Sequence, residues 1–130
     1  MFMFETARTL PAEMYEQHKL PPDSTPADVH DAWSHDAEGN PVGFHRERRF
    51  WQSVVPVCQF TGTSLSSITM YPITLNLDAP RTIRGLPQLA GDEEGREILQ
   101  FLSDLSASWG TKIDISRRDD GWVGTVMWEE

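Results

Sequence analysis

Two stretches of the chain carry apolar residues in the pattern of β-strands, and a short turn joins them. Residues 50–60 form a nearly continuous apolar run, which is typical of a strand covered on both faces. Pro56 inside this run indicates a sheet edge or a bulge, because proline cannot donate to a strand ladder. Residues 65–77 follow a turn at 61–64 and end in regular alternation, so the two runs predict a β-hairpin.

A long helical pattern follows, after a polar segment at residues 78–87 that is rich in proline and arginine. Acidic residues at 92–94 come directly after Gly91 and suit the positive end of a helix dipole. Apolar residues then recur at helical spacing and predict one buried stripe, and Gly110 ends the helix. The stripe consists of Ile98, Phe101, Leu102, Leu105 and Trp109.

The chain closes with a second pair of predicted strands. Residues 111–116 alternate between polar and apolar, residues 117–121 have the composition of a turn, and residues 122–128 return as a strand. Two tryptophans fall inside apolar patterns, so we expect Trp51 and Trp109 in the core, whereas Trp128 near the terminus is expected to be exposed.

Two short helices are predicted before the first hairpin. Thr9 can cap the first of them, with Pro11 in its first turn. Thr25 and Asp28 have the spacing of a capping box for the second helix, which we expect to end near Trp33. The whole order predicts an α+β fold, in which two short N-terminal helices and a hairpin precede a longer amphipathic helix that packs on the sheet, and a C-terminal hairpin closes it.

Composition and charge restrict the possible roles of the chain. Its 130 residues predict a single domain, 1–130, of which 24% are charged and 38% are hydrophobic. A net charge of −9 disfavours a nucleic-acid partner, because phosphate backbones attract basic faces. We identify no membrane segment and no signal peptide, so a cytoplasmic location is the default expectation.

The single cysteine and the first residues carry two further expectations. Cys58 cannot form an internal disulfide, and its place in an apolar run predicts a small buried thiol rather than a nucleophile. Residues 2–4 look like part of a strand, so we expect that a preceding portion of a larger sheet is absent. Unpaired strand groups at that edge would favour self-association.

Two groups of residues are candidates for chemistry. Histidines and aspartates concentrate in the second helix and the loop after it, and the pair Asp31 and His35 has the spacing to share one helix face. A small metal-dependent hydrolase that uses the Asp28–His35 cluster is therefore one hypothesis, although a solvated polar loop explains the same residues better, because no third ligand has a suitable spacing.

Five arginines bracket the first predicted hairpin in an otherwise acidic chain. They could clamp an anion, because guanidinium groups suit carboxylates and phosphates, or they could form salt bridges with Glu47, Asp78 and other acids. The candidate anion-binding residues are Arg46, Arg48, Arg49, Arg81 and Arg84.

Several segments, in the same order along the chain, resemble the C-terminal portion of the CapA family of bacterial capsule or poly-gamma-glutamate synthesis proteins. None of them is a catalytic signature, but together they cover nearly the whole chain. They are Phe2-Met-Phe-Glu, Leu10-Pro-Ala-Glu-Met-Tyr-Glu, Leu20-Pro-Pro-Asp-Ser-Thr-Pro-Ala-Asp-Val, Phe50-Trp-Gln-Ser-Val-Val-Pro-Val-Cys, Arg84-Gly-Leu-Pro-Gln-Leu-Ala, Leu105-Ser-Ala-Ser-Trp-Gly-Thr and Ile113-Asp-Ile. One departure is Leu86, where the family pattern Arg-Gly-Arg-Pro has a second arginine.

The resemblance implies a metallophosphatase-like β-sandwich of which this chain supplies one part. The divalent metal pair and its ligands would belong to an N-terminal catalytic half, so no metal ligand or catalytic residue is assigned to this chain. The arginine-rich segment at residues 78–87 would pass near the mouth of the active site. We therefore expect a chain that is not catalytic by itself, and that is either a fragment of a longer reading frame or a partner for a separately encoded catalytic half. The rival hypotheses are a stand-alone module that binds a polyanion and the metal-dependent hydrolase.

Overall fold

The fold is taken from a computed structural model that describes residues 11–128. The chain divides into two compact units, Met1–Glu47 and Arg48–Glu130, and each is described by itself. The prediction of a single domain over residues 1–130 stays a prediction. Helices and an antiparallel sheet with a helix packed on it confirm the α+β class. None of the described helices is both long and apolar enough to cross a membrane.

The first unit contains two short α-helices, α1 (Ala12–Gln17) and α2 (Pro26–Ser34). The capping box predicted for the second helix is present, since the Thr25 amide donates to the Asp28 carboxylate at 2.6 Å and the Asp28 amide donates to the Thr25 hydroxyl at 3.4 Å. At the first helix the N-cap is Pro11 rather than Thr9. Thr9 and the strand-like residues 2–4 lie outside the described residues.

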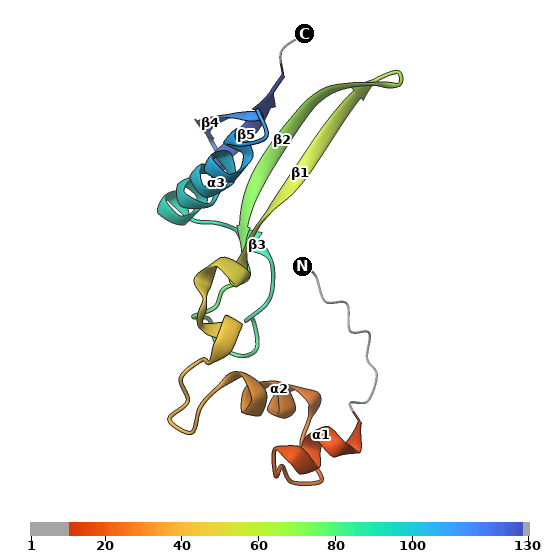
Figure 1. Ribbon diagram of the computed structural model, residues 1–130, viewed down its shortest axis with the longest axis vertical. Coiled ribbons are helices and arrows are strands. Elements are labelled where there is room, and N and C mark those ends of the chain that lie inside the picture. The colour runs from red at the N-terminus through yellow and green to blue at the C-terminus, as the bar shows by residue number, and fades with distance from the viewer. Residues whose placement is uncertain (1–10, 129–130) are drawn as a thin grey trace. The chain divides into compact units, whose positions relative to one another are not determined.

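Two 3-10 helices, η1 (Gly43–Arg46) and η2 (Arg48–Trp51), come before the sheet. The sheet of the second unit is antiparallel and has the order β1-β2-β5-β4, with β3 also paired to β2 (Figure 1). Its strands are β1 (Gln52–Thr61), β2 (Ser64–Thr74), β3 (Gln88–Leu89), β4 (Lys112–Arg118) and β5 (Gly121–Met127). Both predicted hairpins are therefore confirmed, although the second strand ends at Thr74, three residues earlier than predicted.

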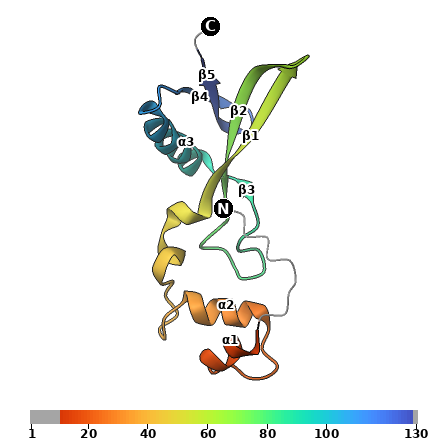
Figure 2. The same cartoon turned by 45° about the vertical axis from the view of Figure 1, so that its right-hand side comes forward.

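The predicted long helix is α3 (Asp92–Ala107), and it lies on one face of this sheet (Figure 2). A Cβ atom added to Gly124 of β5 would lie 3.0 Å from side-chain atoms of both Leu99 and Ile113. The absence of a side chain at Gly124 therefore allows α3, β4 and β5 to pack closely at this point. Leu99 is completely buried at this contact. Gly95 allows a second close approach, to Pro72 of β2.

The first strand is not covered on both faces, which corrects the prediction. It is the edge strand of the sheet, as Pro56 indicated, and the register shift lies between Gln59 and Phe60 rather than at the proline. Val55 and Val57 are 43% and 45% exposed. The continuous apolar run was a misleading signal, because no second layer covers these valines among residues 48–128.

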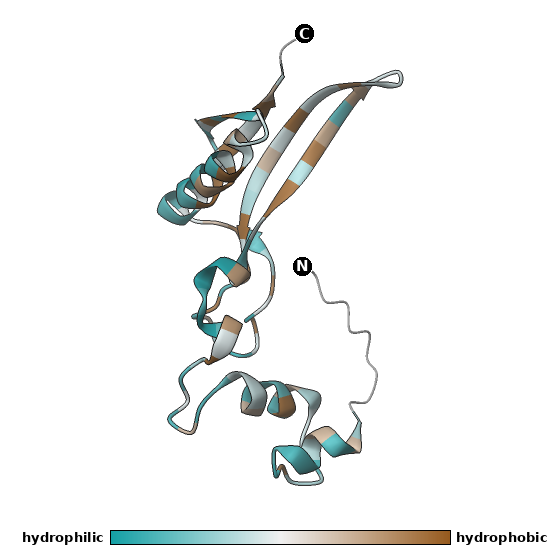
Figure 3. Ribbon diagram, in the orientation of Figure 1, coloured by the Kyte–Doolittle hydropathy of each residue, from teal (hydrophilic) through white to brown (hydrophobic). Residues whose placement is uncertain are grey.

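Cys58 is also exposed, so the prediction of a buried thiol is wrong. The β1–β2 hairpin explains this exposure, because among residues 11–128 no third strand lies beside its far part: the pairing of β2 with β5 comprises Thr69 and Met70. In Figures 1 and 2 the tip of the hairpin stands apart from β4, β5 and α3. Figure 3 shows that hydrophobic positions continue along this projecting part.

The buried face of α3 is displaced from the predicted stripe. It contains Ile98, as expected, but its centre is Leu99, whereas Phe101 and Leu105 are exposed. Trp109 is 87% exposed rather than in the core, because the helix ends at Ala107 and the chain turns at Gly110, where φ is +77°. Trp51 is half-buried and Trp128 is exposed, the latter as predicted.

Candidate anion-binding site

The polar segment after β2 folds into a closed loop over residues 75–87. The Leu75 amide donates to the Trp51 carbonyl at 2.7 Å, and the Gly85 amide donates to the Leu75 carbonyl at the same distance. The Asn76 side chain also donates to the Leu86 carbonyl, at 3.1 Å. The two ends of the loop are therefore tied to each other and to the residue that precedes β1, as in other compact surface loops.

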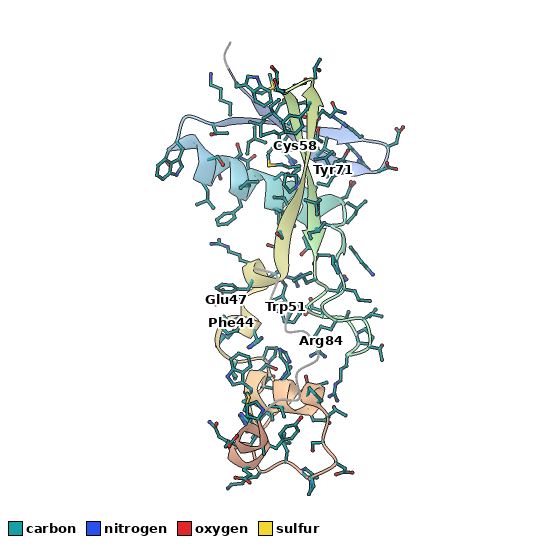
Figure 4. All side chains as sticks on the ribbon, turned by 90° about the vertical axis from the view of Figure 1, so that its right-hand side faces the viewer. Phe44, Glu47, Trp51, Cys58, Tyr71 and Arg84 are labelled. Carbon is teal, nitrogen blue, oxygen red and sulfur yellow. The ribbon has the colours of Figure 1, made fainter. Side chains whose placement is uncertain are left out.

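Backbone hydrogen bonds inside the loop orient its two arginines. The amides of Ile83 and Arg84 both donate to the Pro80 carbonyl at 2.9 Å, so Arg81 and Arg84 lie on one tight turn. The Nε of Arg84 donates to the Ala79 carbonyl at 3.3 Å, which holds the stem of this side chain against its own loop. Figure 4 shows Arg84 and Trp51 at the end of the sheet from which the loop emerges.

Arg48 connects this loop to the rest of the unit. Its Nη2 lies 2.7 Å from Asp78 Oδ2, and its Nη1 lies 3.6 Å from Glu94 Oε1 at the start of α3. The Gln52 side chain donates to the same Glu94 oxygen at 2.8 Å. The hydrogen bond to Asp78 raises the pKa of Arg48 above its ordinary value, and the charges of Asp78 and Glu94 act in the same direction. The salt-bridge alternative is thus confirmed for the pair Arg48 and Asp78.

The remaining predicted arginines have different surroundings. The Arg49 guanidinium lies 4.5 Å from the centre of the Phe101 ring on α3, in cation–π geometry. Within residues 11–128 this guanidinium makes no ion pair. Arg46 is on η1 and belongs to the first unit. The structure therefore brings Arg48 to the loop of Arg81 and Arg84, and the clamp of five arginines stays a prediction.

The histidines of the first unit are part of an aromatic cluster. The ring of His45 lies 5.1 Å from the ring of His30, 4.8 Å from that of Trp33 and 4.0 Å from that of Phe44, measured between ring centroids. Burial lowers the pKa of His45, and the nearby His30 and His35 lower it further by charge repulsion. These contacts make His45 a packing residue of this unit.

The Asp28–His35 cluster, proposed as a metal site, has other interactions. Asp28 closes the capping box of α2, His35 Nδ1 lies 2.9 Å from the Ser34 hydroxyl, and Asp36 accepts from the Asn40 amide at 2.8 Å. That last bond lowers the pKa of Asp36. Over residues 11–128, no group of three histidine, cysteine, aspartate or glutamate side chains is placed to hold a metal ion.

A cavity that the sequence analysis did not predict lies beside β2, with a volume of about 110 Å³. Its lining includes Tyr71 of β2, Arg118 at the end of β4 and Asp120 in the turn that follows. The sequence indicated that residues 117–121 form a turn, and the turn is confirmed. No sequence signal pairs that turn with β2, because the contact depends on where the two hairpins meet.

Comparison with known proteins gives two relatives and no family assignment. No protein-family model matches the chain. Uncharacterized protein y4sH and uncharacterized protein y4uA of Sinorhizobium fredii (strain NBRC 101917 / NGR234) are each 31% identical to it over 122 residues. The aligned part is 90% of this chain and 26% of either relative. The chain thus spans about a quarter of the length of the curated relatives it matches.

Proposed function

We propose that this chain is the C-terminal, non-catalytic region of a CapA-like protein of capsule or poly-gamma-glutamate biosynthesis. In this proposal it packs against a separate catalytic half, which holds the divalent metal pair. The ordered resemblance of segments along the chain supports the proposal. The longer relatives are compatible with it, since most of their length lies outside the aligned part.

The face of the sheet opposite α3 is the observation that carries this proposal. Gly124 of β5 faces Leu99 of α3. Gly124 is paired with Met70 of β2, and Met70 is in turn paired with Pro56 of β1. Paired residues of neighbouring strands share a face and consecutive residues alternate, so Val55 and Val57 are on the face away from α3. Over residues 48–128 the one α-helix is α3, and it packs on the other face of the sheet.

These exposed valines and the edge of β1 would be the contact surface for the catalytic half. Burying an apolar side chain of this size stabilises a complex by roughly 1.5–3 kcal/mol if it is fully removed from water. In this proposal the metal pair belongs to the catalytic half, and no catalytic step is assigned to the side chains of this chain.

An activity assay and an association assay test the proposal together. The pure chain, supplied with divalent metals and p-nitrophenyl phosphate, is expected to show no turnover. Tagged in its own cells, it is expected to co-purify with a polypeptide that mass spectrometry identifies as metallophosphatase-like. Val57→Glu should abolish that association, and Gln100→Glu, on an exposed position of α3, should preserve it. Metal-dependent turnover by the isolated chain would overturn the proposal.

Binding of a polyanion is the second candidate function, and the loop of residues 75–87 favours it. Arg81 and Arg84 lie on one turn of that loop, while its Asp78 is paired with Arg48. A glutamate oligomer is the appropriate probe, titrated at low and at moderate salt because exposed charges are screened. The double substitution Arg81→Ala/Arg84→Ala should remove binding, whereas Arg117→Ala should not. If the double variant Arg81→Ala/Arg84→Ala bound the glutamate oligomer as strongly as the Arg117→Ala variant does, this loop would be excluded as the site.

A further inference from the structure

The cavity beside β2 lies where the sheet divides. β5 pairs with β2 at Thr69 and Met70, and β3 pairs with β2 at Ile73 and Thr74, so Tyr71 and Pro72 lie between the two pairings. The cavity lies at this fork and is partly open to solvent. Its volume is about 110 Å³. It is lined by Tyr71, Pro72, Leu89, Ala90, Arg118, Asp120, Trp122 and Val123.

Two opposite charges border this cavity and have no ionic partner among residues 11–128. Arg118 ends β4, and Asp120 lies in the turn that leads to β5. Neither side chain forms an ion pair within that part of the chain. The adjacent Arg117, in contrast, lies 2.8 Å from the carboxylate of Asp92. A guanidinium and a carboxylate that border one cavity present a site for a ligand that carries both charges.

The remaining walls are apolar or aromatic. Leu89 and Pro72 are aliphatic lining residues, and Tyr71 and Trp122 are aromatic ones. The Trp122 ring already has the Arg96 guanidinium 5.5 Å from its centre, so Tyr71 is the aromatic residue that would favour a ligand cation, and its hydroxyl offers a polar atom for hydrogen bonding. Cavities that bind drug-sized molecules measure about 300–1,000 Å³. The volume of this cavity is below that range, which favours a small ligand over one of the size of a nucleotide.

We propose that this cavity binds a free α-amino acid with a small side chain. Its carboxylate would accept hydrogen bonds from the Arg118 guanidinium, whose fork matches carboxylate geometry. Its ammonium group would donate to Asp120, beside the aromatic walls. The short side chain would contact Leu89 and Pro72. Asp120 disfavours a phosphate or another dianion at the same place, because its negative charge would repel such a ligand.

Titration with L-alanine, followed by backbone amide shifts in NMR spectra of the whole chain, tests this proposal. Saturable shifts are expected at Ala90 and Val123, with a dissociation constant of about 1–10 mM, because so small a ligand makes few contacts. Propionate and ethylamine each carry one of the two charges and should bind at least about tenfold more weakly. Binding of propionate as strong as that of alanine would overturn the proposal, since it would reduce the site to an anion site.

Variants with matched controls complete the test. Arg118→Gln and Asp120→Asn should each weaken alanine binding by about tenfold or more, the loss of one charge-assisted hydrogen bond. Arg117→Gln and Asp119→Asn make the same chemical changes at the neighbouring positions and should leave the dissociation constant within about twofold. Circular dichroism identifies any variant that fails to fold. Unchanged binding in a folded Arg118→Gln variant, or no saturable shift in the natural chain, would overturn the proposal.

Discussion

The guanidinium of Arg48 lies 2.7 Å from the carboxylate of Asp78, thirty residues away along the chain. This contact joins the segment before β1 to the closed loop after β2. It also explains why an arginine that the sequence presents as an anion ligand is neutralised within the fold. Both side chains are more than half exposed, so solvent screens the attraction.

Removing either partner of this pair should lower stability only slightly. Arg48→Gln and Asp78→Asn are each expected to reduce the free energy of unfolding by about 0.2–1 kcal/mol, the range of exposed ion pairs. The double mutant should lose less than the sum, because both substitutions remove the same contact. Urea denaturation at low and high salt measures these differences. A coupling energy that is unchanged by salt would contradict the assignment of a screened surface pair.

Gly124 of β5 should not tolerate a side chain. A Cβ atom there would lie 3.0 Å from Leu99 and from Ile113, and 3.4 Å from Met70. Gly124→Ala is therefore expected to lower the free energy of unfolding by about 1–3 kcal/mol, as overpacking does. In a Leu99→Ala background the cost should be smaller, because one of the close neighbours is gone. Equal costs in both backgrounds, measured by chemical denaturation, would show that Leu99 is not the obstacle.

Truncation of two apolar residues in the α3 region should affect stability very differently. Leu99 is completely buried, so Leu99→Ala is expected to cost about 2–5 kcal/mol. Trp109 is 87% exposed, so Trp109→Ser should change stability by no more than about 0.5 kcal/mol. Thermal or urea unfolding of the two variants checks this. A large loss for Trp109→Ser would mean that this side chain is covered in solution.

Acidification should weaken the first unit through His45. Burial and the charges of His30 and His35 lower the pKa of His45 in the folded unit below its ordinary value of about 6.5. Between these two pKa values the unfolded chain binds more protons at this position than the folded chain. The contribution of His45 to stability is therefore fully present above about pH 6.5 and decreases as the pH falls towards the folded pKa.

Proton NMR of the histidine rings measures this pKa directly. His30→Asn should raise the pKa of His45, because it removes one of the two repelling charges. His18→Asn is the matched control and should leave the pKa of His45 unchanged, since His18 is not among the groups that shift it. A His45 pKa at or above about 6.5 in the natural chain would contradict the buried aromatic cluster.

Local sequence determined the parts of this protein that depend on neighbours along the chain. The Thr25–Asp28 capping box, both hairpins and the start of α3 after Gly91 were all predicted, because caps, turns and alternation act within a few residues. Pro56 indicated either a sheet edge or a bulge, and the structure shows that β1 is the edge strand.

Tertiary structure alone decided which of the apolar and charged residues are buried or paired. Nothing in the run of residues 50–60 indicates how much of it is covered, so its pattern predicts a buried Cys58 and buried valines, whereas Cys58, Val55 and Val57 are exposed in the structure. The Arg48–Asp78 pair and the cavity between β2 and the β4–β5 turn join segments far apart in sequence. Such contacts depend on how strands and helices pack, and periodicity along the chain carries no information about that packing.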